Sequence, residues 1–459
     1  METFPVWICE EIVAGYRERG LASLFRWQAE VLSDASLRAP HYANLLFSAP
    51  TSAGKTVVAE LIAVNTVLTT KRKALFIFPY VSVAREKFIA LQKLWRSVNL
   101  RVRAYVGACS APLDCWDAAV CTIEKANSLL NRATEEGTLE DIGVVVVDEF
   151  HMIFDSNRGQ IIEHMVAKLL YASAYLSHHV QIIAMSATIS NLAEIADWLK
   201  AHQFETHFRP VELEEGILIG KTICDVQTLL PLRSISSRFE LPADPERIIQ
   251  LCMESLSLGD SVLIFCSSKA ETEKVATMVS NHLRELLSEE PQQDFNHMLK
   301  IDALSFFVEY FQNETQSSDE ILLTTIPTGV AFHHAGLTME EREAVEDGFR
   351  AGVLRILVAT STLSSGVNLP AQRVIIKAQL SGPSALTNIA YRQMVGRAGR
   401  LGQSSKGKPP YNPIEKNVAH KNVESYRVNE VACWLMGLCS VVNTTIHNAA
   451  QRWPFEIAN

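Results

Sequence analysis

The run Leu45-Leu46-Phe47-Ser48-Ala49-Pro50-Thr51-Ser52-Ala53-Gly54-Lys55-Thr56 decides the fold of this chain. Its first four residues form a short apolar segment, which predicts a strand buried on both faces. The apolar segment Val57–Leu68 follows the loop and predicts a helix. A strand, a glycine-containing loop that ends in Lys-Thr, and a helix together form the context of a phosphate-binding loop.

The loop supplies the groups that bind phosphate. Gly54 permits a tight turn in which backbone amides face the phosphates, and the N-terminus of the next helix adds a partial positive charge. We expect Lys55 to reach the β- and γ-phosphates and Thr56 to ligate Mg²⁺. Ala49 replaces the usual first glycine, so a glycine-capped loop that only starts a helix stays an alternative. The predicted nucleotide-binding loop residues are Ala49, Pro50, Thr51, Ser52, Ala53, Gly54, Lys55 and Thr56.

A pair of carboxylates follows a second buried strand segment, Val144–Val147. Because ligands of parallel sheets bind at the carboxyl ends of strands, we expect Asp148 to hold Mg²⁺. Glu149 is expected to polarise the attacking water as the general base. His151 is expected to couple the ATP site to the neighbouring domain. An acidic helix N-terminus would explain an isolated Asp-Glu pair, but the phosphate loop upstream favours a catalytic pair.

A third motif consists of small hydroxyl residues after a predicted strand. Ser186-Ala187-Thr188 comes directly after Gln181–Met185, and its hydroxyl groups can bind the acidic motif and relay its state. An ordinary helix N-cap stays open as the alternative, since Asn191-Leu192-Ala193-Glu194 follows.

A fourth motif is the run Gln393-Met394-Val395-Gly396-Arg397-Ala398-Gly399-Arg400. Its two arginines are three residues apart, which predicts that both lie on the same face of a helix. Arginines from one domain can neutralise the γ-phosphate bound by another, and hydrolysis then depends on domain closure. A solvated basic helix is the alternative.

Alternation of strand and helix segments predicts an α/β fold with two parallel-sheet domains and a short C-terminal extension. We expect domain 1 at residues 1–204, a connector at 205–244, domain 2 at 245–402 and a divergent tail at 403–459, either truncated or disordered. Ser288–Thr325 is interpreted as an insertion that is helical around Ala303–Phe311. The expected strands are Leu45–Ser48, Ala74–Phe78, Val144–Val147, Gln181–Met185, Ser261–Cys266, Arg355–Ala359 and Arg373–Ile376.

Composition places few limits on function. The 459 residues are 48% hydrophobic and 20% charged, which is ordinary for globular domains, and the net charge of −9 gives no indication of nucleic acid. The nine cysteines show no CxxC spacing, so we expect reduced thiols and neither a zinc site nor a disulfide framework. The apolar run Val431–Val442 is too short to span a bilayer and is interpreted as a buried helix. A soluble, intracellular protein without a membrane partner is expected.

Taken together, these motifs resemble those of superfamily 2 helicases of the DExH class, in the Ski2-like group, and especially its polymerase-theta-type members. The resemblance covers the chain from about Trp7 to Gly402. Further matching motifs are Leu24–Glu30, Pro79–Lys87, Cys121–Asn127, Phe265–Lys269, Phe332–Leu337 and Ala359–Ala371.

The resemblance implies two tandem RecA-like domains and roles for individual residues. Gln28 would bind the adenine base, Gly366 and Asn368 would lie near the nucleotide, and Gln393 would lie near the γ-phosphate. His333 and His334 are interpreted as structural or strand-contacting residues, with a metal pair as the alternative. The implied contacts with the nucleic-acid backbone are Ser82, Arg85, Thr122 and Thr360.

The implied function is an ATP- and Mg²⁺-dependent DNA helicase that moves 3′ to 5′ along single-stranded DNA during DNA repair in the nucleus. An RNA helicase of the same group stays open, because the core motifs contact the backbone and hardly distinguish sugars. The family continues after its last arginine motif with a winged helix and a ratchet domain, and residues 403–459 do not resemble that continuation. A truncated form that binds nucleotide or nucleic acid without unwinding is therefore a further alternative.

Overall fold

The computed structural model describes most of residues 2–397 and one later segment. The described ranges are 2–51, 53–107, 116–155, 158–187, 189, 191–210, 213–226, 228–235, 244, 246–289, 299–360, 363, 369, 371–378, 386, 388–397 and 429–435. These residues form two compact units, the first built mainly from residues up to 210 and the second mainly from residues after 212.

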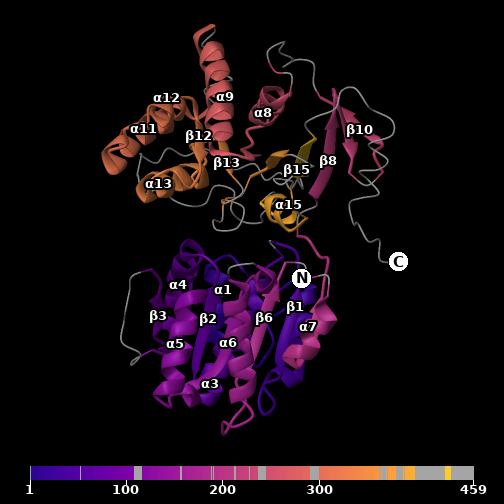
Figure 1. Ribbon diagram of the computed structural model, residues 1–459, viewed down its shortest axis with the longest axis vertical. Coiled ribbons are helices and arrows are strands. Elements are labelled where there is room, and N and C mark those ends of the chain that lie inside the picture. Colours follow the sequence, from indigo (N-terminus) through magenta and orange to yellow (C-terminus); the bar gives the residue numbers. More distant parts are fainter. Residues whose placement is uncertain are drawn as a thin grey trace. The chain divides into compact units, whose positions relative to one another are not determined.

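The first unit contains a seven-stranded sheet in the order β3-β4-β2-β5-β6-β1-β7 (Figure 1). Every neighbouring pair in this sheet is parallel, so all its strands end at the same edge. Most strands are buried along their whole length, as expected for a parallel sheet with both faces covered. The strands are β1 Asn44–Ser48, β2 Lys73–Phe78, β3 Val102–Tyr105, β4 Ala118–Thr122, β5 Ile142–Val147, β6 Gln181–Ser186 and β7 Ala201–Glu205.

Alternate strand residues of this sheet enter two separate apolar cores. On β5, Val144 and Val146 belong to one core, whereas Val145 and Val147 belong to the other. Helices α1 to α4 cover the first core, and α5 to α7 cover the second. The helices are α1 Glu10–Glu18, α2 Arg26–Ser33, α3 Lys55–Thr70, α4 Val81–Trp95, α5 Ile123–Glu135, α6 Gly159–Ala172 and α7 Leu192–Leu199, with short 3-10 helices at Ala35–Leu37, Arg96–Val98, Leu139–Asp141 and Phe150–Phe154 (η4).

The second unit contains an eight-stranded sheet in the order β10-β9-β8-β15-β14-β11-β13-β12. The pairs β8–β9 and β9–β10 are antiparallel, and the other pairs are parallel. The strands are β8 Leu213–Ile219, β9 Thr222–Asp225, β10 Pro231–Ser234, β11 Val262–Cys266, β12 Val330–His333, β13 Ile356–Thr360, β14 Arg373–Ala378 and β15 Asn429–Leu435.

Helices of the second unit pack directly on these strands. The long helix α9 lies against β12 and β13, α13 lies against β12, and α15 lies against β14 (Figure 1). Local side-chain caps fix where several of them begin. Thr338 and Glu341 form a reciprocal capping box at α13, and Asp319 accepts hydrogen bonds from the first amides of α12. The helices are α8 Ile248–Ser257, α9 Lys269–Glu289, α11 Ile301–Thr315, α12 Glu320–Thr325, α13 Met339–Arg350 and α15 Asn388–Val395, with a 3-10 helix at Ile326–Thr328.

Each strand expected from the sequence is present to within two residues, in the unit where it was expected. The predicted helical part of the insertion, Ala303–Phe311, lies inside α11 and is confirmed.

The segment at 205–244 carries the end of β7 and the strands β8 to β10, three strands that extend the second sheet. The predicted helix within Val431–Val442 is wrong for residues 431–435, which belong to β15 between β14 and β8. None of the described helices has the length and apolar character needed to cross a membrane.

Candidate ATP-binding and hydrolysis site

Three of the predicted motifs meet at the carboxyl edge of the first sheet. The phosphate loop follows β1, Asp148 follows β5, and Ser186 ends β6. Because β6 lies between β5 and β1, its last residue stands between the other two motifs. The amide of Ala49 donates to the carbonyl of Ser186 at 3.1 Å, and the amide of Asp148 donates to the carbonyl of Ile77 at 3.0 Å. The sheet therefore brings the predicted ATP-site motifs together, as expected for ligands bound beyond strand ends.

The turn of the phosphate loop depends on Gly54. This residue has φ 86° and ψ 29°, a left-handed conformation that favours glycine. A Cβ atom here would lie 2.6 Å from Nε2 of Gln28. Gln28 is buried, donates from this nitrogen to the carbonyl of Gly54 at 2.9 Å, and accepts from the amide of Phe25 at 2.9 Å. Gln28, predicted to bind adenine, thus also fixes the loop at the start of α3.

Ala49 fits the loop although the usual pattern has glycine there. Its methyl group is fully buried in the apolar core, as is that of Ala53. Pro50 is also buried, whereas Thr51 and Thr56 are half-buried at the loop and the first turn of α3. Ser52 lies outside the described residues. Ala49 is not among the described residues with a positive φ, so this position requires no left-handed backbone and tolerates a side chain.

The ammonium group of Lys55 lies inside the loop. It donates to the carbonyls of Ala49 at 2.8 Å and Pro50 at 3.1 Å, and the side chain is only 8% exposed. A phosphate group in the loop would be a stronger, charged acceptor for this nitrogen than a carbonyl. The arrangement matches a lysine that binds the phosphates of a nucleotide.

The two carboxylates after β5 have different surroundings. Oδ1 of Asp148 accepts from the amide of Glu149 at 2.8 Å. Burial, followed by the charge of Glu149, raises the pKa of Asp148 to about 7. Glu149 has φ 49° and ψ 47°, a strained conformation for a residue with a side chain. Its buried Oε2 accepts no hydrogen bond from the described residues, so this oxygen is suited to accept one from water.

His151 connects Glu149 with Ser186. Its Nδ1 lies 3.1 Å from Oγ of Ser186 and 3.4 Å from Oε2 of Glu149. The ring is buried, and this burial lowers the pKa of His151, so the neutral form is favoured. The contact with Ser186 supports the relay interpretation of that motif. The helix-cap alternative for Ser186 is wrong, because α7 begins after Asn191; Thr188 lies outside the described residues.

The predicted Mg²⁺ ligands fit a cation. Asp148 and Glu149 place two acidic groups side by side, and the raised pKa of Asp148 reflects a buried negative charge that the protein only partly compensates. Lys55 and Lys87 contribute the positive charge that lowers this pKa. Carboxylate and hydroxyl oxygens are suitable Mg²⁺ ligands, so Asp148 and Thr56 are chemically able to hold the ion.

The predicted nucleic-acid contacts lie at or just after the carboxyl ends of strands in both sheets. In the first unit, Ser82 and Arg85 are exposed on α4, and Thr122 ends β4. A cavity of about 380 Å³ lies between these motifs, lined by Pro79, Tyr80, Thr122, Lys125 and Arg158 among others. In the second unit, Thr360 ends β13 and is mostly buried. Their contacts with nucleic acid stay predictions.

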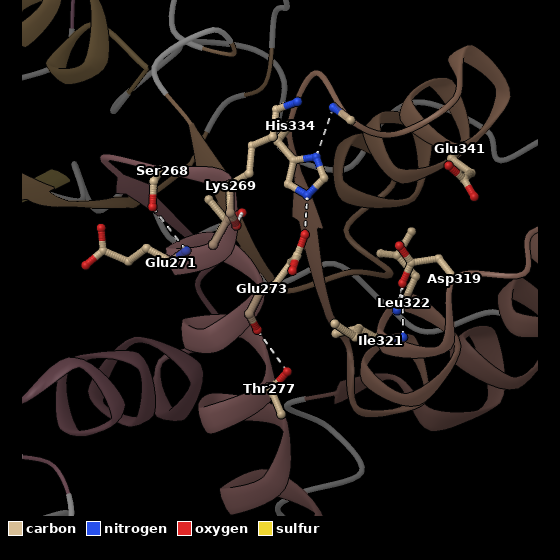
Figure 2. A network of polar contacts seen from close by, with 12 residues as sticks. Ser268, Lys269, Glu271, Glu273, Thr277, Asp319, Ile321, Leu322, His334 and Glu341 are labelled. Carbon is tan, nitrogen blue, oxygen red and sulfur yellow. Dashed lines mark hydrogen bonds and ion pairs between the residues drawn. The ribbon is translucent and has the colours of Figure 1, made fainter.

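The contacts of the histidine pair in the second unit support the structural interpretation. His333 and His334 are successive residues at the end of β12, so their side chains point to opposite sides. Nε2 of His333 lies 2.9 Å from Glu346 of α13, and Nε2 of His334 lies 3.0 Å from Glu273 of α9. Figure 2 shows His334 between Glu273 and a backbone amide, which is that of Gly336 at 3.1 Å from Nδ1. Each histidine thus has a carboxylate partner on a different helix, and among the described residues no group of three or more His, Cys, Asp or Glu side chains is placed to hold a metal.

The arginine motif differs from its prediction. Helix α15 carries Gln393 but ends at Val395, and Arg397 lies in the turn that follows. The carbonyl of Arg397 accepts from the amide of Ala371 at 3.2 Å, which holds this turn against the strand segment before β14. The expectation that Arg397 lies on a helical face is therefore wrong. Arg400, Gly366 and Asn368 lie outside the described residues.

Two buried or half-buried groups in the first unit were missed from the sequence. Tyr16 donates to Glu60 at 2.5 Å, which ties α1 to the helix that follows the phosphate loop. Arg158 contacts both segments that carry predicted nucleic-acid contacts. Both depend on partners far away in the sequence, and no local pattern indicates them.

Comparison with known proteins agrees with this geometry. Residues 26–195 match the DEAD/DEAH box helicase family, and residues 281–402 match the helicase conserved C-terminal domain. The chain belongs to the Ski2-like DExH helicases.

Relatives of this helicase chain include two polymerases and a helicase. It is 42% identical over 476 residues to DNA polymerase theta of Caenorhabditis elegans, which covers 99% of this chain and 29% of the relative. It is 43% identical over 416 residues to DNA polymerase theta of Mus musculus, covering 86% of this chain and 16% of the relative. It is 35% identical over 374 residues to the ATP-dependent DNA helicase Hel308 of Thermoplasma volcanium, and this match covers 79% of this chain and 49% of the relative. The helicase chain thus spans at most half the length of these relatives.

Proposed function

We propose that the chain is an ATP-dependent DNA helicase or translocase of the polymerase-theta type. It couples ATP hydrolysis to 3′-to-5′ movement on single-stranded DNA in DNA repair, and it works in the nucleus. The observation that carries this proposal is a pair of hydrogen bonds at Ser186. Its hydroxyl group contacts His151, and its carbonyl accepts from the amide of Ala49 in the phosphate loop. A site that only stored nucleotide would have no use for a relay between its general base and its phosphate loop.

MgATP is the proposed nucleotide. Gln28 would contact the adenine base, Lys55 the β- and γ-phosphates, and Thr56 with Asp148 would hold Mg²⁺. The ion would supply positive charge for the transferred phosphoryl group. Glu149 would accept a proton from the attacking water, and the absence of a hydrogen bond to its Oε2 among the described residues supports this role.

Residues of the second unit complete the proposed cycle. Gln393, Arg397 and Arg400, with Gly366 and Asn368, would act on the bound nucleotide when the domains close. Each closure and opening would then advance the motor along one strand. The proposed domains are 1–204 and 245–402, with the connector at 205–244 and the tail at 403–459.

Single-stranded or partly duplex DNA is the proposed substrate. Contacts from Ser82, Arg85, Thr122 and Thr360 would go to phosphates, so binding should depend on salt and little on sequence. The names of the relatives support DNA over RNA, since one is an ATP-dependent DNA helicase and two are DNA polymerases.

Strand displacement on tailed duplexes tests this proposal. We expect the purified chain with MgATP to release the short strand from a duplex with a 3′ single-stranded tail and not from one with a 5′ tail. Glu149→Gln, which keeps the shape of the side chain, is the control and should abolish release. Equal release from RNA duplexes would favour the RNA helicase. ATP hydrolysis without release from any duplex would favour a form that does not unwind.

A further inference from the structure

Arg158 stands at a junction between three segments of the first unit. It precedes α6, and its carbonyl accepts from the amides of Ile161 and Ile162 at the start of that helix. Its Nη1 donates to the carbonyl of Pro79 at 2.8 Å, and its Nε lies 3.1 Å from Oε1 of Glu124. The side chain is 34% exposed, so the guanidinium is ordered by partners rather than extended into solvent.

The partners of Arg158 belong to two different predicted nucleic-acid motifs. Pro79 and Tyr80 begin the segment Pro79–Lys87 after β2, and Glu124 lies in Cys121–Asn127, which joins the end of β4 to the start of α5. The guanidinium also lies over the ring of Tyr80, at 5.4 Å from its centroid. Pro79, Tyr80, Glu124 and Arg158 all line the cavity of about 380 Å³ at this edge of the sheet. One side chain therefore holds the two walls of that cavity together.

Only arginine can make these contacts at once. Its planar fork donates in two directions from one rigid group, and its face stacks on an aromatic ring. A lysine in this place would keep the positive charge but could not satisfy the carbonyl, the carboxylate and the ring together. The carboxylate of Glu124 already partners the guanidinium, so Arg158 is better suited to fixing the walls than to binding a phosphate itself.

The backbone at Arg158 is connected to the predicted general base. Glu149 directly precedes the 3-10 helix η4 as its N-cap, and the amide of Met152 donates to the carbonyl of Glu149 at 2.9 Å. The amide of Asp155 donates to the carbonyl of Met152 at 2.9 Å, and the amide of Arg158 donates to Oδ1 of Asp155 at 2.8 Å. Gly159, the next residue, packs tightly against η4, because a Cβ atom there would lie 2.2 Å from the carbonyl oxygen of Ile153. These hydrogen bonds connect the backbone of Glu149 to that of Arg158 in three steps, so a movement of Glu149 can be transmitted to Arg158.

We propose that Arg158 is a positioning residue that sets the spacing of the Pro79–Tyr80 loop and the start of α5, and so prepares both for one nucleic-acid strand. Through η4, it also ties that spacing to the hydrolytic carboxylate. This inference rests on the proposed function. It identifies Arg158 as a residue that links nucleic-acid binding to the ATP site.

The first test measures ATP hydrolysis by the full chain across a range of single-stranded DNA concentrations. For Arg158→Ala, the DNA concentration for half-maximal stimulation should rise about tenfold, the size expected for loss of a charge-assisted hydrogen bond. The ATP concentration for half-maximal rate should change less than about twofold, since the contacts described for the Arg158 side chain are with Pro79, Glu124 and Tyr80 and not with the phosphate loop. Arg158→Lys should show an intermediate rise. Arg132→Ala, which removes an equal charge from the exposed Arg132–Glu136 pair on α5, is the matched control.

A second measurement separates positioning from direct phosphate contact. If Arg158 positions the walls, Glu124→Gln should weaken DNA binding, and the double variant should bind no worse than Arg158→Ala alone. If Arg158 binds the strand directly, Glu124→Gln should tighten binding, because it releases the guanidinium and removes a negative charge. Loss of a direct contact would also lower the slope of log affinity against log salt by about 1, whereas positioning should leave that slope unchanged.

Each outcome decides the proposal. Wild-type stimulation by DNA with unchanged DNA dependence in Arg158→Ala would overturn the positioning role and leave the proposed function intact. A lowered salt slope, or tighter binding by Glu124→Gln, would overturn it in favour of direct contact. A chain whose hydrolysis responds to neither DNA nor RNA would overturn both proposals. Thermal unfolding of Arg158→Ala near the wild-type temperature excludes a folding defect as the cause of weak DNA binding.

Discussion

Asp148 shows how the chemistry of this site depends on its surroundings at the residue scale. The same side chain on a protein surface would be ionised at any physiological pH. Here burial and the neighbouring Glu149 raise its pKa to about 7. With Mg²⁺ at the proposed site, a proton and the ion would compete for Asp148 near neutral pH, since the carboxylate must lose its proton to ligate a metal.

This competition predicts a pH dependence of Mg²⁺ binding. Asp148 is protonated below its raised pKa, so Mg²⁺ affinity should fall as the pH falls through 7. Between pH 8 and pH 6 the loss should be roughly tenfold, as expected for one proton displaced by the ion. Titration of Mg²⁺ against a fluorescent ADP bound to the chain measures this. Asp148→Asn, repeated at both pH values, subtracts the titration of the nucleotide itself; an equal pH dependence in that variant would contradict the role of Asp148.

The candidate ATP-site residues that the structure brings together were predictable because each belongs to a short local pattern beside a strand. Lys55, Asp148 and Ser186 all follow apolar segments that the structure confirms as β1, β5 and β6. Arg158 was not predictable, because its partners Pro79 and Glu124 are distant in the sequence and are brought to it only by the fold. The adenine role of Gln28 stays a prediction, and its hydrogen bond to Gly54 was not expected from any pattern.

At the scale of elements, buried strands were easier to predict than edge strands or the late segment. The central strands of the first sheet are continuous apolar runs, whereas β7 at its edge has exposed residues and no such signal. The segment containing β15 was predicted as a helix from its apolar composition alone. A short apolar run does not distinguish a buried helix from a buried strand, and here pairing with β14 and β8 decides the outcome.

The turn between β1 and α3 gives a prediction at this scale. Gly54→Ala would place a methyl group in a left-handed turn and against Nε2 of Gln28, so it should lower both stability and nucleotide affinity. Gly137→Ala is the matched control, because Gly137 also has a positive φ, 70°, but has open space at its Cβ. Both variants should lose about 1 kcal/mol of unfolding free energy from the backbone conformation alone. Only Gly54→Ala should lose more than that and bind nucleotide at least tenfold more weakly; equal losses in thermal unfolding and nucleotide titration would contradict this account.

At the scale of the whole molecule, two α/β units of one chain divide the proposed work. The first carries the phosphate loop and the carboxylates, and the second carries Gln393 on α15 and Arg397 just after this helix. The net charge of −9 gave no indication of a nucleic-acid partner, because a few local contacts with phosphates do not require a basic protein. The family match over both units supports a shared cycle of binding and hydrolysis.

The arginine of the second unit yields a prediction about that cycle. Arg397→Ala should retain nucleotide binding, because the phosphate loop belongs to the first unit, and should lose hydrolysis by about a thousandfold, the range found for arginine fingers. Arg350→Ala is the control, since that arginine pairs only with Asp347 at the exposed end of α13 among the contacts described. Nucleotide titration and steady-state hydrolysis measure the two effects; full hydrolysis in Arg397→Ala would contradict a shared site.

The most direct test of the central claim is the rate of ATP hydrolysis by the purified chain with and without single-stranded DNA. We predict hydrolysis that DNA stimulates and that both Lys55→Ala and Glu149→Gln abolish, with Lys55→Ala also losing nucleotide binding. A folded chain that binds ATP but does not hydrolyse it with any single-stranded nucleic acid would contradict the claim that this chain is a motor.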